Sequence, residues 1–198
     1  VPRSPRHVPA AWALVEARPA IREVLSSGGD PLLLPDVRIR RRVRAFARRP
    51  QIDAVRSGTR APVTLPMRVT PELARGLGAF KKVWVNTQFN HAREITLEAA
   101  AACARLVEAG VPVSNQTVLL KGVNDSVEAL FDLCTGLQRI RVRPYYVFVC
   151  DPVAGIAPFR VPLRRARQLE RQLAVRVGGL ALPRFVADVP GSRRKLPV

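Results

Sequence analysis

Residues 83–120, VWVNTQFNHAREITLEAAAACARLVEAGVPVSNQTVLL, contain a strand, a helix and a second strand in one continuous run. Aliphatic and β-branched residues dominate 83–87 and 113–120, which predicts two strands. Between them, Thr96 is a candidate N-cap for an alanine-rich helix over 96–109, and Gly110 ends it. Parallel strands need a crossover of this kind, so this stretch predicts an α/β fold.

The same alternation continues along the rest of the chain. Predicted strands cover 23–26, 52–57, 83–87, 113–120, 142–149 and 184–187, and predicted helices cover 9–16, 36–48, 70–77, 96–109, 126–137 and 162–173. Six β/α units are too few for a closed eight-stranded barrel. We therefore expect an α/β fold built as a partial (β/α)6-type barrel, with parallel strands inside and helices outside, in one domain over residues 1–198.

The composition argues against a membrane or secreted protein. No apolar run approaches the length of about 20 residues that crosses a bilayer, and the N-terminus lacks the apolar stretch of a secretory signal. Cys103, Cys134 and Cys150 are odd in number and widely spaced, which predicts reduced thiols and neither a disulfide framework nor a metal site. We expect a cytoplasmic protein.

The net charge of +18 raises a nucleic-acid-binding alternative. Arginine provides most of this charge and is spread along the chain, becoming dense only over 38–49. There, apolar residues recur at near-helical spacing, a pattern typical of a helix with a solvated arginine face. We therefore do not favour nucleic acid as a partner.

Polar residues follow several predicted strands, at the edge where α/β barrels place their active sites. The first strand ends in Ser27-Gly28-Gly29-Asp30. The glycines allow close backbone approach to a ligand, and the carboxylate can meet an ammonium group. A plain turn explains the same tetrapeptide equally well.

Amide side chains follow the third strand and occupy the fourth, including Gln116, and they can orient a ring or a carboxylate without adding charge. Asn124 and Asp125 precede a predicted helix, so they are candidate N-cap residues. We expect His91 to be structural. A histidine-based metal site has no support, because the only other histidine is His7.

Two acids and a lysine follow the last two strands. Asp151 and Asp188 would form an anionic pocket for a substrate ammonium if both face the barrel mouth. Lys195 follows a Pro-Gly turn and could become a reactive amine if burial or the neighbouring Arg193 and Arg194 lower its pKa. An ordinary surface lysine is the simpler interpretation from composition alone.

Six motifs occur in the order in which they occur in the lysine 2,3-aminomutase family, and the chain resembles that family over nearly its whole length. The motifs are LSSGGD (25–30), SGTRAPV (57–63), LPMRVTPEL (65–73), VNTQFNH (85–91), NQTVLLKGVND (115–125) and RVRPYY (141–146).

The resemblance implies a radical SAM partial barrel that converts L-lysine to β-lysine, an isomerase reaction. In this family, a [4Fe–4S] cluster cleaves S-adenosylmethionine (SAM), and pyridoxal phosphate (PLP) carries the nitrogen between the α and β carbons. Cofactors of this kind perform the chemistry while the protein orients them. The resemblance also implies a homo-oligomer.

The family's site residues are carried over onto matching positions of this chain. Residues Ser27, Gly28, Gly29 and Asp30 correspond to the turn beside the methionine part of SAM, and Gln116 to a residue near PLP. Lys195 matches the PLP-binding lysine, and is the implied catalytic residue. Asp151 and Asp188 match the acids that hold the distal ammonium of lysine, which favours lysine over glutamate as the substrate.

The sequence departs from the family pattern at several places. The CxxxCxxC cysteines and the nearby carboxylate-binding arginine are not in this sequence, and relatives continue beyond Val198. We expect residues 1–198 to be a core without the cluster-binding segment and C-terminal extension. Ser192-Arg193-Arg194 replaces a glycine run, Gln88 and Pro158 replace histidines, and Phe148 replaces a tyrosine. A clusterless relative that binds PLP or an amino acid without radical chemistry is the second hypothesis.

Overall fold

The structure is a computed structural model that describes residues 7–150, 155–189, 191–192 and 194–198. At its centre, seven strands lie side by side in chain order, and the first six run parallel. The strands are β1 (Glu23–Ser26), β2 (Ala54–Gly58), β3 (Val83–Thr87), β4 (Val113–Leu119), β5 (Arg143–Val149), β6 (Arg184–Ala187) and β7 (Leu196–Pro197).

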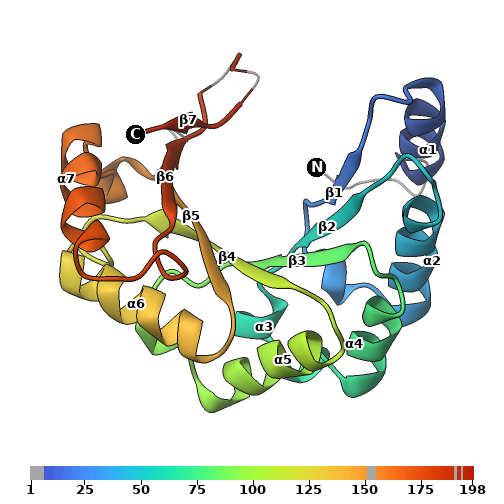
Figure 1. The fold of residues 1–198 in the computed structure, drawn as a ribbon, viewed down its shortest axis with the longest axis horizontal. Helices are drawn as coiled ribbons and strands as arrows, with labels where there is room; N and C mark the ends of the chain where they lie inside the picture. The colour runs from blue at the N-terminus through green and yellow to red at the C-terminus, as the bar shows by residue number, and fades with distance from the viewer. Residues whose placement is uncertain (1–6, 151–154, 190, 193) are drawn as a thin grey trace.

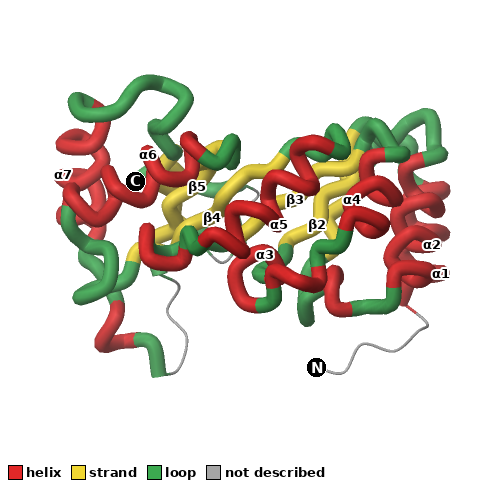
Figure 2. Tube along the Cα trace, turned by 90° about the horizontal axis from the view of Figure 1, so that it is seen from below, coloured by secondary structure: helices red, strands yellow, loops and turns green. Residues whose placement is uncertain are grey.

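The sheet curves into an arch whose convex face is covered by helices, and its concave face stays open between β1 and β6 (Figure 1). Viewed from below, the helices lie across the strands as an outer layer (Figure 2). They are α1 (His7–Ala17), α2 (Asp36–Ala47), α3 (Ala61–Thr64), α4 (Pro71–Gly78), α5 (Leu97–Glu108), α6 (Val127–Arg139) and α7 (Leu163–Ala174). The predicted partial barrel is confirmed.

Local sequence explains where several helices begin. Thr70, Thr96 and Ser126 each accept a hydrogen bond from the backbone N–H three residues on, at 3.1 Å, and so cap α4, α5 and α6. Each cap contributes about 1 kcal/mol by satisfying a backbone donor that has no partner within the helix. The predicted helix and strand ends agree with the observed ones to within two residues.

The six predicted strands are parallel, as expected, and the C-terminal edge carries an additional strand that was not predicted. There β7 pairs antiparallel with β6, with Val186 opposite Pro197 and Ala187 opposite Leu196. The strand has only two residues, so it carries no periodic signal in the sequence. The chain therefore folds back along the edge of the sheet, and this return carries Lys195 to the open face.

The apolar core lies between the sheet and the helices and occupies one face of each strand. Val83 and Val85 of β3 pack with α4 and α5, whereas Leu119 of β4 and Val147 of β5 pack with α6 and α7. Because strand side chains alternate between faces, the intervening residues point to the concave side. No helix within the described ranges is both long and apolar enough to span a membrane.

Candidate active site at the mouth of the partial barrel

The turn after β1 is held open by backbone conformation. Gly28 and Gly29 have φ values of 83° and 52°, a left-handed conformation that side-chain-bearing residues avoid. Both are exposed, and a Cβ added to Gly29 would meet nothing within 4 Å. The turn therefore presents bare backbone at the carboxyl ends of the strands, as the two glycines predicted.

Asp30 has a different role from the one that its charge suggested. Its Oδ1 accepts hydrogen bonds from Leu32 N at 3.0 Å and Thr59 Oγ1 at 2.6 Å, and its Oδ2 accepts from Arg60 N at 2.7 Å and Ala61 N at 3.1 Å. Four protein donors thus occupy the carboxylate. Asp30 fixes the glycine turn against the loop that follows β2, and does not offer a free charge to an ammonium group.

Gln116 lies on the concave face of β4, opposite Tyr146 of β5 in the strand register. A β-bulge between Asn115 and Gln116 inserts Tyr145 as an extra residue on β5, because Asn115 pairs with Pro144 and Gln116 with Tyr146. Nothing in the sequence signalled this bulge. It re-aims the side chains of β5 at the mouth of the barrel.

The two tyrosines of the chain form a pair as a result. Their hydroxyl oxygens are 3.1 Å apart and their ring centroids are 3.9 Å apart. Burial and the hydrogen bond with Tyr146 raise the pKa of Tyr145 above its ordinary value. Tyr145 therefore keeps its hydroxyl proton at neutral pH and donates it to the Tyr146 oxygen.

Lys195 reaches the same concave face from the C-terminal return. Its Nζ lies 4.2 Å from the ring centroid of Phe148 and 5.9 Å from that of Tyr146, and it donates to Asp188 Oδ2 at 3.0 Å. Tyr146 is the register partner of Gln116, so the structure brings the predicted Lys195, Asp188 and Gln116 to one side of neighbouring strands. Among the described residues, the charged group that contacts the amine is this carboxylate. Asp151 and Arg193 lie outside the described residues.

Asn86 is a further polar residue on the concave face, which sequence reasoning did not single out as a site. It lies on β3 between Gly58 of β2 and Ser114 of β4 and is 3% exposed. Its Nδ2 is buried and has no hydrogen-bond partner within the described part of the chain. A buried donor without an acceptor is costly, and ligand sites are a common reason for one.

The remaining predicted polar residues are structural. His91 Nδ1 accepts from Arg93 N at 3.1 Å, as expected for a local cap. The N-cap prediction for Asn124 and Asp125 is wrong, because Ser126 caps α6. Asp125 instead accepts from Gly122 N at 2.8 Å, and Asn124 is buried and binds the backbone of two strand ends. A side chain held between distant segments cannot be recognised from local spacing.

The three cysteines are buried and none forms a disulfide. Burial raises the pKa of Cys103 and of Cys134 to about 12. Within the described residues, no cluster of three His, Cys, Asp or Glu side chains could hold a metal ion.

The dense arginines lie on and just after α2, a helix on the outer side of the sheet (Figure 1), and with Trp12 of α1 they line a groove. One of them, Arg42, also lines a cavity beside the Ser27–Asp30 turn. Arg49 stacks on Trp12 at 4.5 Å and forms an ion pair with Glu16 at 2.9 Å, whereas Ile39, Val43 and Phe46 are buried. The helix thus has the solvated basic face that its periodicity predicted.

Curated proteins named L-lysine 2,3-aminomutase are similar in sequence to this chain over nearly its whole length. The chain is 41% identical over 193 residues to L-lysine 2,3-aminomutase of Acetoanaerobium sticklandii, covering 98% of this chain and 47% of the relative. It is 44% identical over 180 residues to the L-lysine 2,3-aminomutase of Clostridium subterminale, covering 91% of this chain and 43% of the relative. Over the matched residues, the chain belongs to the lysine 2,3-aminomutase family. No protein-family model matches it.

The family also includes a protein named for a different substrate. The glutamate 2,3-aminomutase of Clostridioides difficile is 38% identical over 178 residues, covering 90% of this chain and 42% of the relative. The chain therefore spans less than half the length of each of these curated relatives.

Solved structures support the fold. A radical SAM methyltransferase from Sphaerobacter thermophilus matches with a TM-score of 0.61 at 22% identity, covering 89% of this chain and 54% of that one. Streptococcus suis SuiB bound to S-adenosylmethionine matches with a TM-score of 0.57 at 14% identity, covering 84% and 39%. The architecture is thus the partial barrel that these solved structures share.

Proposed function

We propose that the chain forms the substrate- and PLP-binding part of a radical SAM aminomutase that converts L-lysine to β-lysine. The observation that carries this proposal is the position of Lys195, whose amine lies over Phe148 and beside Asp188 on the concave face that also carries Gln116. We also propose that the residues form a single domain core, that the whole protein is a homo-oligomer, and that it acts in the cytoplasm.

The residues present fit PLP. A primary amine held at a fixed place is what a carbonyl cofactor needs, and the Phe148 and Tyr146 rings offer an apolar surface beside it. Gln116 can orient a ring substituent without adding charge. When bound, PLP supplies the conjugated system that carries the migrating nitrogen. The protein would hold and orient it with Lys195 and Gln116, while Tyr146, the register partner of Gln116, lies on the same face.

The residues also fit SAM. Ser27, Gly28 and Gly29 present backbone at the strand ends, and Asp30 keeps that turn in place through its four hydrogen bonds. The unpaired Asn86 Nδ2 adds one donor on the concave face for an oxygen or nitrogen acceptor. The [4Fe–4S] cluster has no fitting ligand set among the described residues, so we derive no step through it.

Asp188 is the residue that favours lysine over glutamate. A carboxylate attracts the distal ammonium of lysine and repels the distal carboxylate of glutamate. In the structure Asp188 holds the ammonium of Lys195 at 3.0 Å, so it already binds an alkylammonium group at this position. If the Lys195 amine leaves Asp188 to bind PLP, the Asp188 carboxylate would be available for the substrate ammonium. We propose that Asp151 is its partner in this role.

The test is an anaerobic assay of the protein encoded when the reading frame is extended upstream, reconstituted with iron and sulfide and supplied with SAM and PLP. We expect conversion of L-lysine to β-lysine, and loss of most of that conversion in Asp188→Asn. Conversion of L-glutamate in preference to L-lysine would overturn the substrate assignment. PLP binding without turnover of either amino acid would favour the clusterless binding protein.

A further inference from the structure

The loops at the mouth are joined by a continuous chain of polar contacts that begins at Asp30. The Asp30 carboxylate accepts the backbone N–H of Arg60, in the loop after β2, at 2.7 Å. The side chain of Arg60 makes a second contact, with the loop after β3. Arg60 Nη2 donates to Glu94 Oε1 at 2.6 Å, in the loop after β3. Arg60 therefore links the glycine turn to the third loop.

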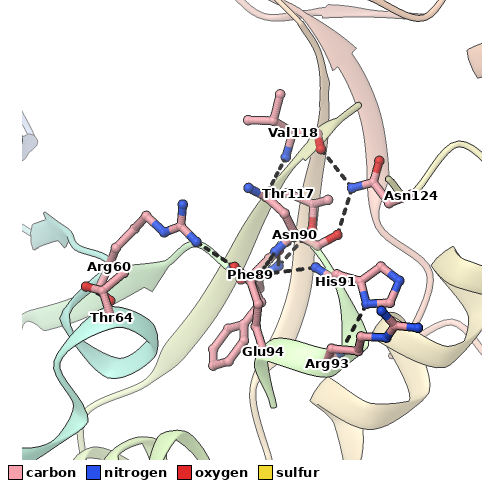
Figure 3. A network of polar contacts seen from close by, with 11 residues as sticks. Arg60, Thr64, Phe89, Asn90, His91, Arg93, Glu94, Thr117, Val118 and Asn124 are labelled. Atoms are coloured by element: carbon pink, nitrogen blue, oxygen red, sulfur yellow. Dashed lines mark hydrogen bonds and ion pairs between the residues drawn. The ribbon is translucent and has the colours of Figure 1, made fainter. Parts of the chain in front are cut away.

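Glu94 continues the chain toward β4. Its Oε2 accepts the backbone N–H groups of Asn90 and His91, which fixes the direction in which Asn90 points. Asn90 Oδ1 accepts from Val118 N at 2.9 Å, and its carbonyl accepts from Asn124 Nδ2 at 2.7 Å. These contacts between the second, third and fourth loops are drawn in Figure 3.

The chain ends on the strand that carries Gln116. Val118 lies two residues beyond Gln116 on β4, and both face the concave side. Asn124 Nδ2 donates to Val118 O at 2.9 Å, and Asn90 Oδ1 accepts from Val118 N, so both backbone groups of Val118 are held. Asn124 Oδ1 also accepts from Leu120 N at 2.7 Å. We call Asp30, Arg60, Glu94, Asn90 and Asn124 the rim network. It connects the turn after β1 with the end of β4 across the two strands between them.

The Arg60–Glu94 pair differs from an ordinary surface ion pair. The side chains are 39% and 27% exposed, against 72% and 66% for the exposed helical pair Arg75–Glu72. Arg60 Nε is buried without a partner in the described residues, so Glu94 is the side-chain contact that fixes the guanidinium. Partial burial strengthens such a pair and makes its loss more costly.

We propose that Arg60 and Glu94 are positioning residues that couple the Gly28-Gly29 turn to the Gln116 strand, so that the two halves of the mouth keep one relative arrangement. The inference rests on the proposed function only for what each half binds, SAM at the turn and PLP near Gln116. Neither residue needs to touch a ligand for this role. Breaking the pair releases the turn and the fourth loop from each other.

The coupling can be measured on this 198-residue chain without any ligand, by amide hydrogen exchange read by NMR. The reporter is the amide of Leu32, which donates to Asp30 and contacts neither Arg60 nor Glu94. In Glu94→Gln we expect exchange at Leu32 to rise about ten-fold, as the loss of roughly 1.4 kcal/mol of local opening energy would give. The matched control, Glu72→Gln, removes an exposed ion pair and should leave it unchanged.

Two further variants separate positioning from a general loss of stability. Arg60→Lys keeps the charge, so protection at Leu32 should be partly restored relative to Arg60→Gln. A Leu32 amide that exchanges at the wild-type rate in Glu94→Gln would overturn the proposal. So would equal acceleration in the last turn of α7, around Leu173, which packs in a different core cluster from Leu32, because that pattern indicates global destabilisation.

The ligand side is measured separately by calorimetric titration with SAM. If the wild-type chain binds SAM, we expect weaker binding in Glu94→Gln and unchanged binding in Glu72→Gln, and equal affinity in both variants would contradict the proposed coupling at the ligand site. Failure of the wild type to bind SAM would count against the proposed function, while the exchange result still decides whether the two loops are coupled.

Discussion

At the scale of single residues, Asp30 shows how a charged side chain can fix the shape of a turn by joining two loops. Its carboxylate has four donors from two loops. Asp30→Asn replaces one acceptor oxygen by a donor group that faces N–H groups. We expect the free energy of unfolding to fall by about 1–3 kcal/mol, measured by urea denaturation.

The control for Asp30 is Asp132→Asn, an exposed position on α6, which should change stability by no more than about 0.5 kcal/mol. An Asp30→Asn chain as stable as the wild type would contradict the role of this carboxylate in joining the two loops.

The tyrosine pair gives a prediction in the alkaline range. Because the pKa of Tyr145 is raised above its unfolded value near 10, the folded state binds the proton more tightly than the unfolded state. The resulting contribution to stability is complete below pH 10 and is lost as the pH rises through the folded pKa. Tyr145 and Tyr146 are the only tyrosines, so ultraviolet absorbance titration reports this pair alone.

We expect tyrosinate absorbance to appear later in the native chain than in the chain in denaturant. Tyr145→Phe should remove the late-titrating component from the native curve. Coincident native and denatured titration curves for the wild type would show that the pair is not buried and hydrogen-bonded as described.

At the scale of elements, periodicity and capping residues predicted the six parallel strands and six of the helices. The features that they did not predict depend on contacts between segments distant in the sequence. The alternation of 83–120 predicts a strand, a helix and a strand, and β3, α5 and β4 confirm it. The bulge beside Gln116 and the two-residue β7 have no local pattern. Both arise from pairing with a neighbouring strand, yet they place the tyrosine pair and Lys195.

The same distinction explains which site residues could be predicted. Gly28 and Gly29 were found because a left-handed turn selects glycine wherever it occurs. Lys195, Gln116 and Asp188 were candidates because of their positions at or after predicted strands, and the family resemblance implied a role for each. The burial of Asn86 and the pairing of Arg60 with Glu94 depend on which strands and loops surround them, and no spacing rule reveals these neighbours.

Packing between α4 and α5 leads to a prediction about Gly78. A Cβ built on Gly78 would lie 1.9 Å from the carbonyl oxygen of Ala109, so the two helices cannot keep their approach if it is replaced. We expect Gly78→Ala to lower the free energy of unfolding by about 1–3 kcal/mol or more. Gly179→Ala, where nothing lies within 4 Å, should cost no more than about 0.5 kcal/mol.

Thermal unfolding of the two glycine variants gives the comparison directly. Equal melting temperatures for Gly78→Ala and Gly179→Ala would contradict the close contact between the end of α4 and the end of α5.

At the scale of the whole molecule, the densest group of arginines lies on α2, a helix on the outer side of the sheet. The net charge of +18 predicts non-specific attraction to polyanions, while the arginine face of α2 offers no enclosed site. We expect binding of a single-stranded oligonucleotide at 50 mM salt to fall at least about ten-fold by 200 mM, measured by fluorescence anisotropy. Tight binding that is insensitive to salt would indicate a specific nucleic-acid site.

The central claim is that the mouth of the partial barrel holds PLP through Lys195, and peptide mapping after PLP addition tests it most directly. The chain has four lysines, Lys81, Lys82, Lys121 and Lys195, so borohydride trapping followed by mass spectrometry assigns the modified residue without ambiguity. Lys121→Ala removes an exposed lysine and is the matched control for Lys195→Ala. We predict saturable modification of Lys195 in the wild type and in Lys121→Ala, and its loss in Lys195→Ala. Modification spread over all four lysines, or unchanged saturable binding in Lys195→Ala, would contradict the account.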